Sequence, residues 1–150
     1  MSGSSIRFGS DLEGMRSEDF PLLTGRGQFT DDLNVDGQLH AVFVRAPVAH
    51  ADIDNIETKE ALSIPGVIGI YTGSDLVAAN IGDVPAATSI NGRNGNPMLH
   101  APVPVLAHDR IRHVGEPVAI VVAKTIASAQ DGANAVHLEL RERPAAATVT

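Results

Sequence analysis

The sequence of 150 residues is long enough for one domain with its own core, but too short for a cofactor domain together with a substrate domain. Its hydrophobic share of 43% and charged share of 19% are typical of a globular protein, and its formal net charge of −7 argues against nucleic acid as a partner. The sequence has no cysteine, which excludes disulfides, thiolate zinc sites and cysteine-ligated iron–sulfur clusters within it.

Aromatic residues make up only 3% of the sequence, so Val, Ile, Leu and Ala are expected to form the core. Phe20, Phe29 and Phe43 are predicted to be its largest members. The N-terminus lacks the apolar segment of a signal peptide, and no run approaches the roughly 18 to 20 apolar residues of a membrane span. We therefore expect a cytoplasmic protein with no membrane partner.

The chain is expected to have three parts. Residues 1–18 are polar and rich in Gly and Ser, which predicts a flexible N-terminal arm. The domain is expected to span 19–144, with a loose tail at 145–150 that Pro144 opens.

The first part of the domain is predicted to alternate between strands and short helices. Alternating apolar residues predict strands over 38–45 and 50–57, and the Asp52 and Asp54 side chains mark the second as an edge or surface strand. A short helix over 58–63 and a strand over 67–72 follow, and Gly73-Ser74-Asp75 resembles the start of another helical turn.

The stretch 77–104 is rich in Gly, Asn, Pro and Ala and is predicted to be a long loop. Loops longer than about 12 to 15 residues are uncommon in compact domains unless they are functional or lie on a partner. This loop is therefore a candidate contact surface.

The last part of the domain contains the most apolar run, Val118–Ala123, which predicts a strand that is buried on both faces. Shorter strands are expected before it, at 103–106 and 110–114. A helix over 125–135 and a final strand over 136–141 complete the domain. Strands and helices segregated in this way predict an α+β fold with a mixed, mostly antiparallel sheet, two main helices and a long loop.

The histidines are the first residues to test as metal ligands. No two of them have the i, i+2 or i, i+4 spacing of a metal site, and none belongs to a His-Glu-x-x-His motif. They are expected to be solvated or to lie at the edge of the core, and no metal site is predicted. The six are His40, His50, His100, His108, His113 and His137.

Two motifs near the N-terminus have structural explanations. Gly25-Arg26-Gly27 lacks the three spaced glycines of a dinucleotide fingerprint, so a turn with positive φ is the better interpretation. Asp31 and Asp32 are adjacent, so on an extended chain their carboxylates point apart, and capping or turn formation explains them.

The most specific local motif is Gly115-Glu116-Pro117, which places one carboxylate at the mouth of the buried strand. A lone general base with no partner group is a poor catalyst, so a structural or interface corner is favoured over catalysis by Glu116 with a nearby His. The sequence contains no nucleophile elbow and no Walker loop. We predict no catalytic, cofactor-binding or metal residue in this chain.

An ordered series of stretches resembles a known family. The series comprises residues 18–32 with Leu22-Leu23-Thr24-Gly25-Arg26-Gly27 and Asp31-Asp32, then 39–47 with His50-Ala51, then Pro65-Gly66-Val67 with 72–76, and finally 114–123. In this order and spacing it resembles the N-terminal α/β-hammerhead domain of molybdenum hydroxylase large subunits, the family of xanthine dehydrogenases, aldehyde oxidases and carbon monoxide dehydrogenases. The resemblance covers roughly residues 16–145.

The resemblance implies a non-catalytic first domain or split subunit of an enzyme that oxidises aldehydes or N-heterocycles. Molybdopterin, iron–sulfur clusters and FAD are implied for partner domains or subunits, namely the remaining molybdopterin-binding part and an iron–sulfur subunit. The family-motif positions are expected to lie at an interface: Gly25, Arg26, Gly27, Asp31, Asp32, His40, Arg45, Gly115, Glu116 and Pro117. The sequence departs from the family pattern at its close, Leu140-Arg141-Glu142-Arg143-Pro144, and at Val48.

Two other interpretations stay open at this point. The chain could be a remnant of such a subunit, or it could be a free-standing module with the hammerhead fold that binds a small ligand or a protein through its long loop.

Overall fold

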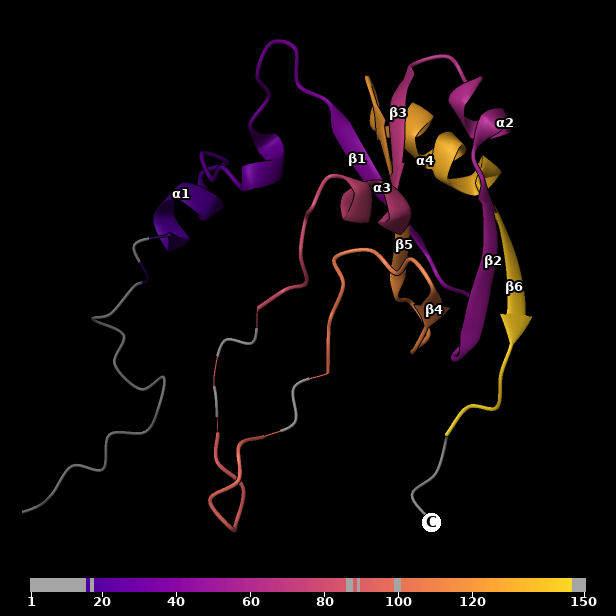
Figure 1. Ribbon diagram of the computed structural model, residues 1–150. Helices are drawn as coiled ribbons and strands as arrows, with labels where there is room; N and C mark the ends of the chain where they lie inside the picture. The colour runs from indigo at the N-terminus through magenta and orange to yellow at the C-terminus, as the bar shows by residue number, and fades with distance from the viewer. Residues whose placement is uncertain (1–15, 17, 86–87, 89, 99–100, 147–150) are drawn as a thin grey trace, which may run out of the picture. The chain divides into compact units, whose positions relative to one another are not determined.

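The computed structural model describes residues 16, 18–85, 88, 90–98 and 101–146 (Figure 1). The chain divides into two compact units, Met1–Gln38 and Leu39–Thr150, which are described separately below. Most of the arm expected at 1–18 lies outside the described residues, and the tail expected at 145–150 is described only to residue 146, with no helix or strand. No helix in the described part of the chain is long and apolar enough to cross a membrane.

The first unit contains two short helical elements, α1 (Asp19–Leu23) and a 3-10 turn over Thr30–Asp32. Neither element has a buried residue, and Phe20 and Phe29 are 62% and 65% exposed. The prediction that these two aromatic residues anchor the core is therefore wrong. Elements of three and five residues are too short to present an apolar layer that could enclose a phenyl ring.

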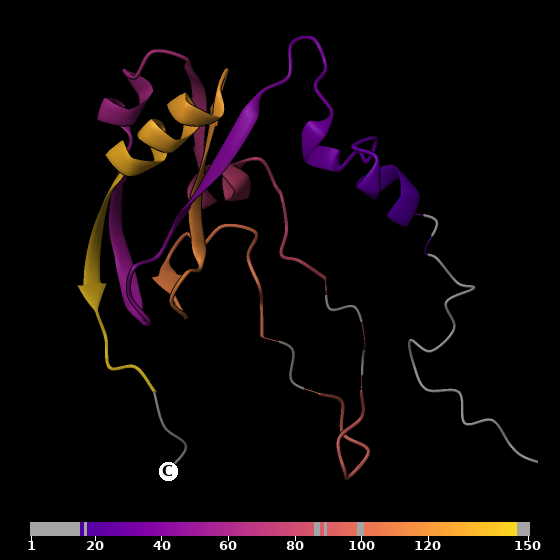
Figure 2. The ribbon, with the colours of Figure 1, turned by 180° about the vertical axis from the view of Figure 1, so that it is seen from behind.

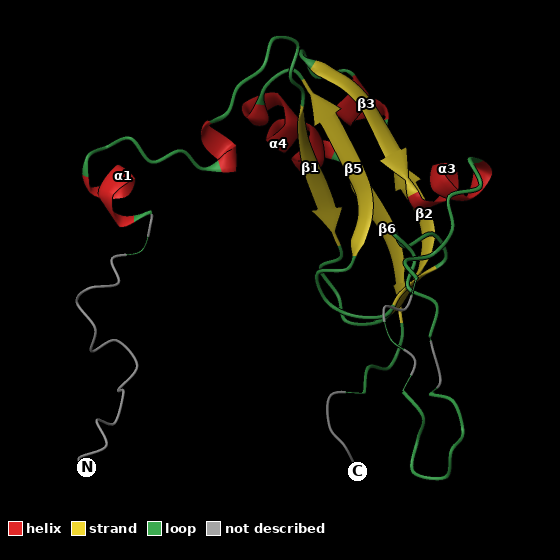
Figure 3. Ribbon diagram, turned by 90° about the vertical axis from the view of Figure 1, so that its left-hand side faces the viewer, coloured by secondary structure: helices red, strands yellow, loops and turns green. Residues whose placement is uncertain are grey.

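The second unit contains a three-stranded antiparallel sheet, sheet A, in the order β1-β5-β3. Its strands are β1 (His40–Arg45), β5 (Pro117–Ala123) and β3 (Val67–Thr72). The apolar run predicted to be buried forms β5, the central strand (Figure 3). Its side chains alternate between an inner face, which includes Val121, and an outer face, which includes Ile120 and Val122.

One helix covers the inner face of sheet A, as Figures 1 and 2 show from opposite sides. This is α4 (Ile126–Ala135), which begins after Thr125, whose hydroxyl accepts a hydrogen bond from the Ser128 N–H at 3.1 Å. A Cβ on Gly132 would lie 2.8 Å from Val121 Cγ1, so this glycine lets the helix backbone approach the sheet closely. The short helix α2 (Lys59–Leu62) packs beside α4.

The second unit also contains sheet B, which is antiparallel and has the order β4-β2-β6. Its strands are β4 (Arg110–Ile111), β2 (Ala51–Glu57) and β6 (His137–Glu142). The strand was predicted to be an edge or surface strand, and the edge alternative is wrong, because β4 and β6 pair with its two sides; Asp54 and Asn55 are exposed, as a surface strand requires. Charged side chains on β2 suggested an edge, but arginines of the neighbouring strands satisfy them within the sheet.

Helix α3 (Gly73–Ala78) follows β3 directly, as the sequence predicted. The Thr72 N–H and hydroxyl each donate to Asp75 Oδ2 at 2.7 Å, and these hydrogen bonds lower the pKa of the Asp75 carboxyl. A Cβ on Gly73 would lie 2.6 Å from the carbonyl oxygens of Leu106 and Ala107, so the chain returns to α3 at the end of its long connection.

The long connection between α3 and β4 contains no helix or strand among its described residues, apart from one bridge between Asn91 and Pro97. The predicted loop over 77–104 agrees with this from residue 79 onward wherever the chain is described, whereas Val77 and Ala78 belong to α3. The strand predicted over 103–106 is absent, and that predicted over 110–114 is reduced to β4. The chain turns at Gly115, whose φ is 81°, so pairing cannot continue.

The core is aliphatic, as the composition predicted. Small and β-branched residues from both sheets meet in it. They are Val44, Ala46, Ala51, Ala107, Ile111, Val118, Ala119 and Val121. Phe43 lies outside this core and is 44% exposed on the outer face of sheet A, so its predicted role as an anchor is wrong. The predicted α+β class is confirmed, and every described strand pair is antiparallel.

Candidate functional site

The corner at Gly115-Glu116-Pro117 joins β1 to the start of β5. The Ala46 N–H donates to the Glu116 carbonyl at 2.9 Å, and the Gly115 N–H donates to the Ala46 carbonyl at 2.8 Å. The Arg45 guanidinium donates from Nη1 to the Gly115 carbonyl at 2.9 Å. Arg45 and the corner, both singled out in the sequence, are thus brought together by backbone hydrogen bonds.

The Glu116 carboxylate is directed into its own loop and not toward solvent. The residue is only 6% exposed, and its Oε2 accepts a hydrogen bond from the Arg112 N–H at 2.5 Å. The exposed His113 ring places Nδ1 3.8 Å from the same oxygen. A buried carboxylate that is bonded to backbone holds a loop in place, and its burial separates it from a substrate in solution.

A second buried carboxylate, Asp52 on β2, lies among three arginines. Arg110 Nε donates to Asp52 Oδ1 at 2.8 Å, and Arg143 Nε donates to Oδ2 at 2.6 Å, with Arg143 Nη2 also 2.6 Å from Oδ2. Arg141 Nη2 is 3.5 Å from Oδ2 and 3.0 Å from Asp54 Oδ1. Together these residues form an ionic cluster on the outer face of sheet B.

The ionic cluster holds the pKa of the Asp52 carboxyl at about 2, below its ordinary value of 3.8. The hydrogen bond from Arg143 contributes most, burial acts in the opposite direction, and the hydrogen bond from Arg110 lowers the pKa further. The sequence analysis missed this cluster. Two features of the sequence pointed toward it: Asp52 lies on the expected polar face of a strand, and several arginines lie close together near the C-terminal end. Neither feature predicts which strands pair, so neither brings these residues together.

The family-motif residues of the first unit serve its local structure. Gly25 has a φ of 67° and ends the turn after α1, and the Arg26 N–H donates to the Pro21 carbonyl at 2.8 Å. Asp32 accepts a hydrogen bond from the Phe29 N–H at 2.9 Å. The predicted roles of this segment in turn formation and capping therefore hold for Gly25 and Asp32.

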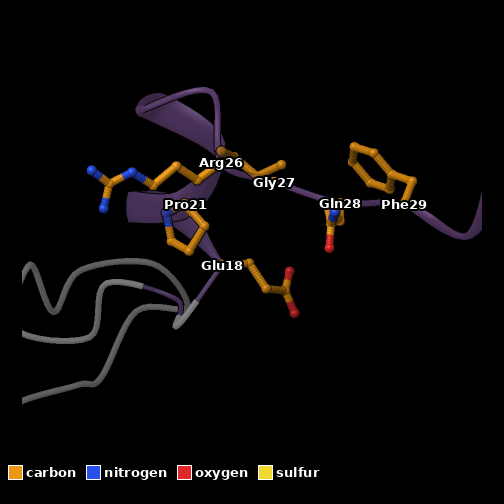
Figure 4. A pocket seen from close by; sticks show the side chains of 7 residues that line it. Glu18, Pro21, Arg26, Gly27, Gln28 and Phe29 are labelled. Carbon is orange, nitrogen blue, oxygen red and sulfur yellow. The ribbon is translucent and has the colours of Figure 1, made fainter. Parts of the chain in front are cut away.

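A shallow hollow lies in the same unit (Figure 4). The Arg26 guanidinium and the Glu18 carboxylate extend in different directions, so the two charges do not converge on one point (Figure 4). Gly27 also lines it, whereas Asp31 does not. The lining residues are Glu18, Pro21, Leu22, Arg26, Gly27, Gln28 and Phe29.

The described histidines do not gather into a site. His40 lies on β1 opposite Ala123, and His50 Nδ1 is 2.7 Å from the Pro144 carbonyl oxygen. His100 lies outside the described residues. In the part of the chain that the structure describes, no three His, Asp or Glu side chains come together as metal ligands.

Comparison with known proteins gives matches to one family. The family model described as "Aldehyde oxidase and xanthine dehydrogenase, a/b hammerhead domain" matches residues 24–144. The nicotine 6-hydroxylase large subunit of Paenarthrobacter nicotinovorans is 46% identical over 125 residues, which are 83% of this chain and 15% of that protein. The putative xanthine dehydrogenase molybdenum-binding subunit of Escherichia coli K12 is 35% identical over 136 residues, 89% of this chain and 17% of that protein.

The fold also matches solved structures. The crystal structure of quinoline 2-oxidoreductase from Pseudomonas putida 86 superposes with a TM-score of 0.76 and 38% identity, over 87% of this chain and 16% of that one. The chain therefore spans less than a fifth of the length of these relatives.

Proposed function

The chain belongs to the aldehyde oxidase and xanthine dehydrogenase a/b hammerhead domain family, as its resemblance predicted, and we propose that it is the non-catalytic first domain or split subunit of a molybdopterin-dependent hydroxylase or dehydrogenase. Its work is packing and assembly. The observation that carries this proposal is the match over residues 24–144, nearly the whole chain, to a segment that makes up 15% to 17% of the large subunits of the relatives.

The described residues of this chain offer no ligand set for a metal ion such as molybdenum. The described part of the chain has no group of three possible metal ligands, and the buried carboxylates of Glu116 and Asp52 are already bonded to their own neighbours. When bound in the remaining domains, molybdopterin would supply the hydroxylation of an aldehyde or an N-heterocycle carbon. We assign no step of that reaction to this chain.

The partners in this proposal are the remaining molybdopterin-binding part and an iron–sulfur subunit, with FAD as a further cofactor of the complex. We propose 19–144 as the domain, with 1–18 as an arm and 145–150 as a tail. The family-motif positions from Gly25 to Asp32, together with His40, Arg45 and the corner at Gly115-Glu116-Pro117, are proposed to shape its interface with these partners. The match of the family model over residues 24–144 supports the proposed domain, because it includes nearly all of 19–144.

The proposal is tested by purifying the tagged chain, at its natural level, from the cells that make it. We expect molybdenum and pterin to accompany the chain in stoichiometric amounts, either on a second polypeptide or on a longer form of the same one. A monomer of 15.7 kDa that carries neither would contradict the proposal. The proposal includes the cytoplasmic location expected from the sequence, which cell fractionation tests.

A further inference from the structure

The outer face of sheet A is apolar. Cross-strand neighbours place Phe43, Ile120 and Tyr71 in one row. Ala41, Val122 and Gly69 form the next row toward α2. Leu39 precedes the first strand, and Ile68 protrudes at a bulge in the third. We call these eight residues the open face.

Among the described residues of the 39–150 unit, no helix or strand covers the open face, which is turned toward the viewer in Figure 3, with α4 behind the sheet. Its large side chains are about half exposed, at 49% for Leu39, 52% for Ile68 and 50% for Tyr71. The inner face differs, because Val121 is fully buried beneath α4. An antiparallel sheet commonly has one apolar and one polar face, so a sheet that is apolar on both faces normally has both covered.

The side chains of the open face are arranged for contact with another surface. A Cβ on Gly69 would lie 3.3 Å from the Tyr71 hydroxyl, so the tyrosine side chain lies across the glycine. The Arg45 guanidinium carbon is 5.7 Å from the centre of the Phe43 ring. Aromatic side chains that combine a broad apolar surface with a polar end are the usual anchors of protein interfaces.

Two basic side chains lie at the edge of the open face. Arg45 extends from the end of β1, and the exposed Lys124 follows β5 on the same alternation as Ile120 and Val122. None of the eight residues of the face is acidic, although the whole chain has a net charge of −7. The surface that complements this face is therefore apolar with carboxylates at its rim.

We propose that the open face docks onto an apolar surface, rimmed by carboxylates, of the molybdopterin-binding part of the enzyme. This inference rests on the proposed function, and it assigns the contact with the partner to the outer face of sheet A. The occupant follows from the relatives, because the matched segment in Escherichia coli is 17% of a molybdenum-binding subunit and is continuous with the rest of it. Charge complementarity with Arg45 and Lys124 specifies the chemistry of that surface.

The experiment compares the wild-type chain with Phe43→Ser and Tyr71→Ser, each tagged and expressed in its own cells. The amount of molybdenum and pterin that elutes per chain is measured, together with the melting temperature of each purified chain. Each variant is expected to lose about tenfold or more of the co-eluting molybdenum, because it removes an aromatic anchor. Ile126→Ser is the matched control, since Ile126 is 58% exposed on α4 and lies away from the open face.

Failure of this inference differs from failure of the proposed function. If the wild-type chain carries no molybdenum, the proposed function fails. If the wild-type chain and both variants carry equal amounts, the docking face is wrong and the proposed function stands. If the wild-type chain forms a dimer that Phe43→Ser dissociates, or retains only an iron–sulfur protein through this face, the proposed occupant is wrong.

A charge-reversal variant keeps the test independent of folding. Lys124→Glu reverses an exposed charge. The backbone N–H of residue 124, and not the lysine ammonium group, donates to the Gly66 carbonyl at 2.8 Å. It is expected to weaken retention severalfold at low salt and less at high salt, because salt screens the attraction to the rim carboxylates. Unchanged retention at both salt concentrations would overturn the charge complementarity.

Discussion

The two sheets of the 39–150 unit complete their outer faces in different ways. On sheet B, Asp52 is bonded to Arg110 and Arg143, so the outer face satisfies its own charges within the chain. On sheet A, Phe43 and Tyr71 remain about half exposed with no covering element in the same unit. One outer face is therefore suited to water and the other to a partner, although both sheets share one core.

The contrast supports the proposed role in assembly over a role in catalysis. Sheet B has the ionisable groups, but they neutralise one another and hold β6 and the following residues against β2. Sheet A has the accessible surface, but the eight residues of the open face include no carboxylate and no imidazole.

The largest expected effect comes from pushing α4 off the inner face of sheet A. Gly132→Val adds a Cβ 2.8 Å from Val121 Cγ1 and 3.1 Å from Val67 Cγ2, together with two further methyl groups. We expect the free energy of unfolding to fall by about 3 kcal/mol, because Val121 is fully buried and cannot move aside. Urea denaturation followed by circular dichroism measures it.

Ala127→Val is the control for this prediction, since Ala127 is exposed on the same helix. It should lower the free energy of unfolding by only about 0.5 kcal/mol, because valine has a lower helix propensity than alanine. Equal losses for the two variants would mean that α4 does not pack on sheet A through Gly132.

The next effect separates the two faces of β5. Val121→Ala removes two buried methyl groups from the inner face and should lower the free energy of unfolding by about 2 kcal/mol. Val122→Ala makes the same chemical change on the open face and should cost about 1 kcal/mol or less in the isolated chain. A larger loss for Val122 than for Val121, measured by the same urea titration, would reverse the assignment of the faces.

A smaller effect is expected from the ionic cluster of sheet B. Asp52→Asn removes the shared carboxylate but leaves arginine side chains that are 40% to 66% exposed, so water can solvate them. We expect a fall in melting temperature at pH 7 that is smaller than the fall caused by Val121→Ala. Differential scanning calorimetry on the two variants compares them directly.

The same variant has a pH signature. The pKa of Asp52 is about 2 in the folded chain against an ordinary 3.8, so its stabilisation is complete above pH 3.8 and is lost as the pH falls toward 2. The melting temperature of the wild-type chain should therefore fall more steeply than that of Asp52→Asn over this range. The pKa of Asp75 is also lowered, but both proteins keep this residue. The difference between their melting curves therefore reports on Asp52. Parallel curves would show that the cluster does not stabilise the fold.

The smallest effect is expected at the exposed edge of the same cluster. Asp54→Asn removes one partner of an ion pair with Arg141 in which both side chains are about half exposed or more. The free energy of unfolding should change by less than about 0.5 kcal/mol, because water and salt already screen this pair. A loss as large as that of Asp52→Asn would mean that the cluster depends equally on all its members.

Sequence patterns predicted the helices and strands that are buried on one face or on both faces. The apolar run of β5, the capped helix α4 and the alternation of β6 were all recovered from local spacing. The ends of the short strands were not, because Gly115 turns the chain at a point that apolar content does not mark.

Long-range pairing was the part that the sequence could not supply. The alternation of 38–45 was correctly predicted, but it does not say which face of the strand is covered, so Phe43 was wrongly placed in the core. The same limit applies to Asp52, which meets Arg110 and Arg143 from positions 58 and 91 residues away. The corner at Gly115-Glu116-Pro117 was predicted as structural, and its backbone bonding to Ala46 agrees with that interpretation.

The contrast between the two outer faces is tested most directly by thiol labelling, since the chain has no cysteine of its own. Ala41→Cys places one thiol on the open face, and Asp54→Cys places one on sheet B. Labelling rates are read from the modified peptides by mass spectrometry, in the isolated chain and in the molybdenum-containing assembly. We predict that assembly slows labelling at position 41 at least about tenfold and leaves position 54 unchanged; equal rates at position 41 in the two samples would contradict the docking of sheet A.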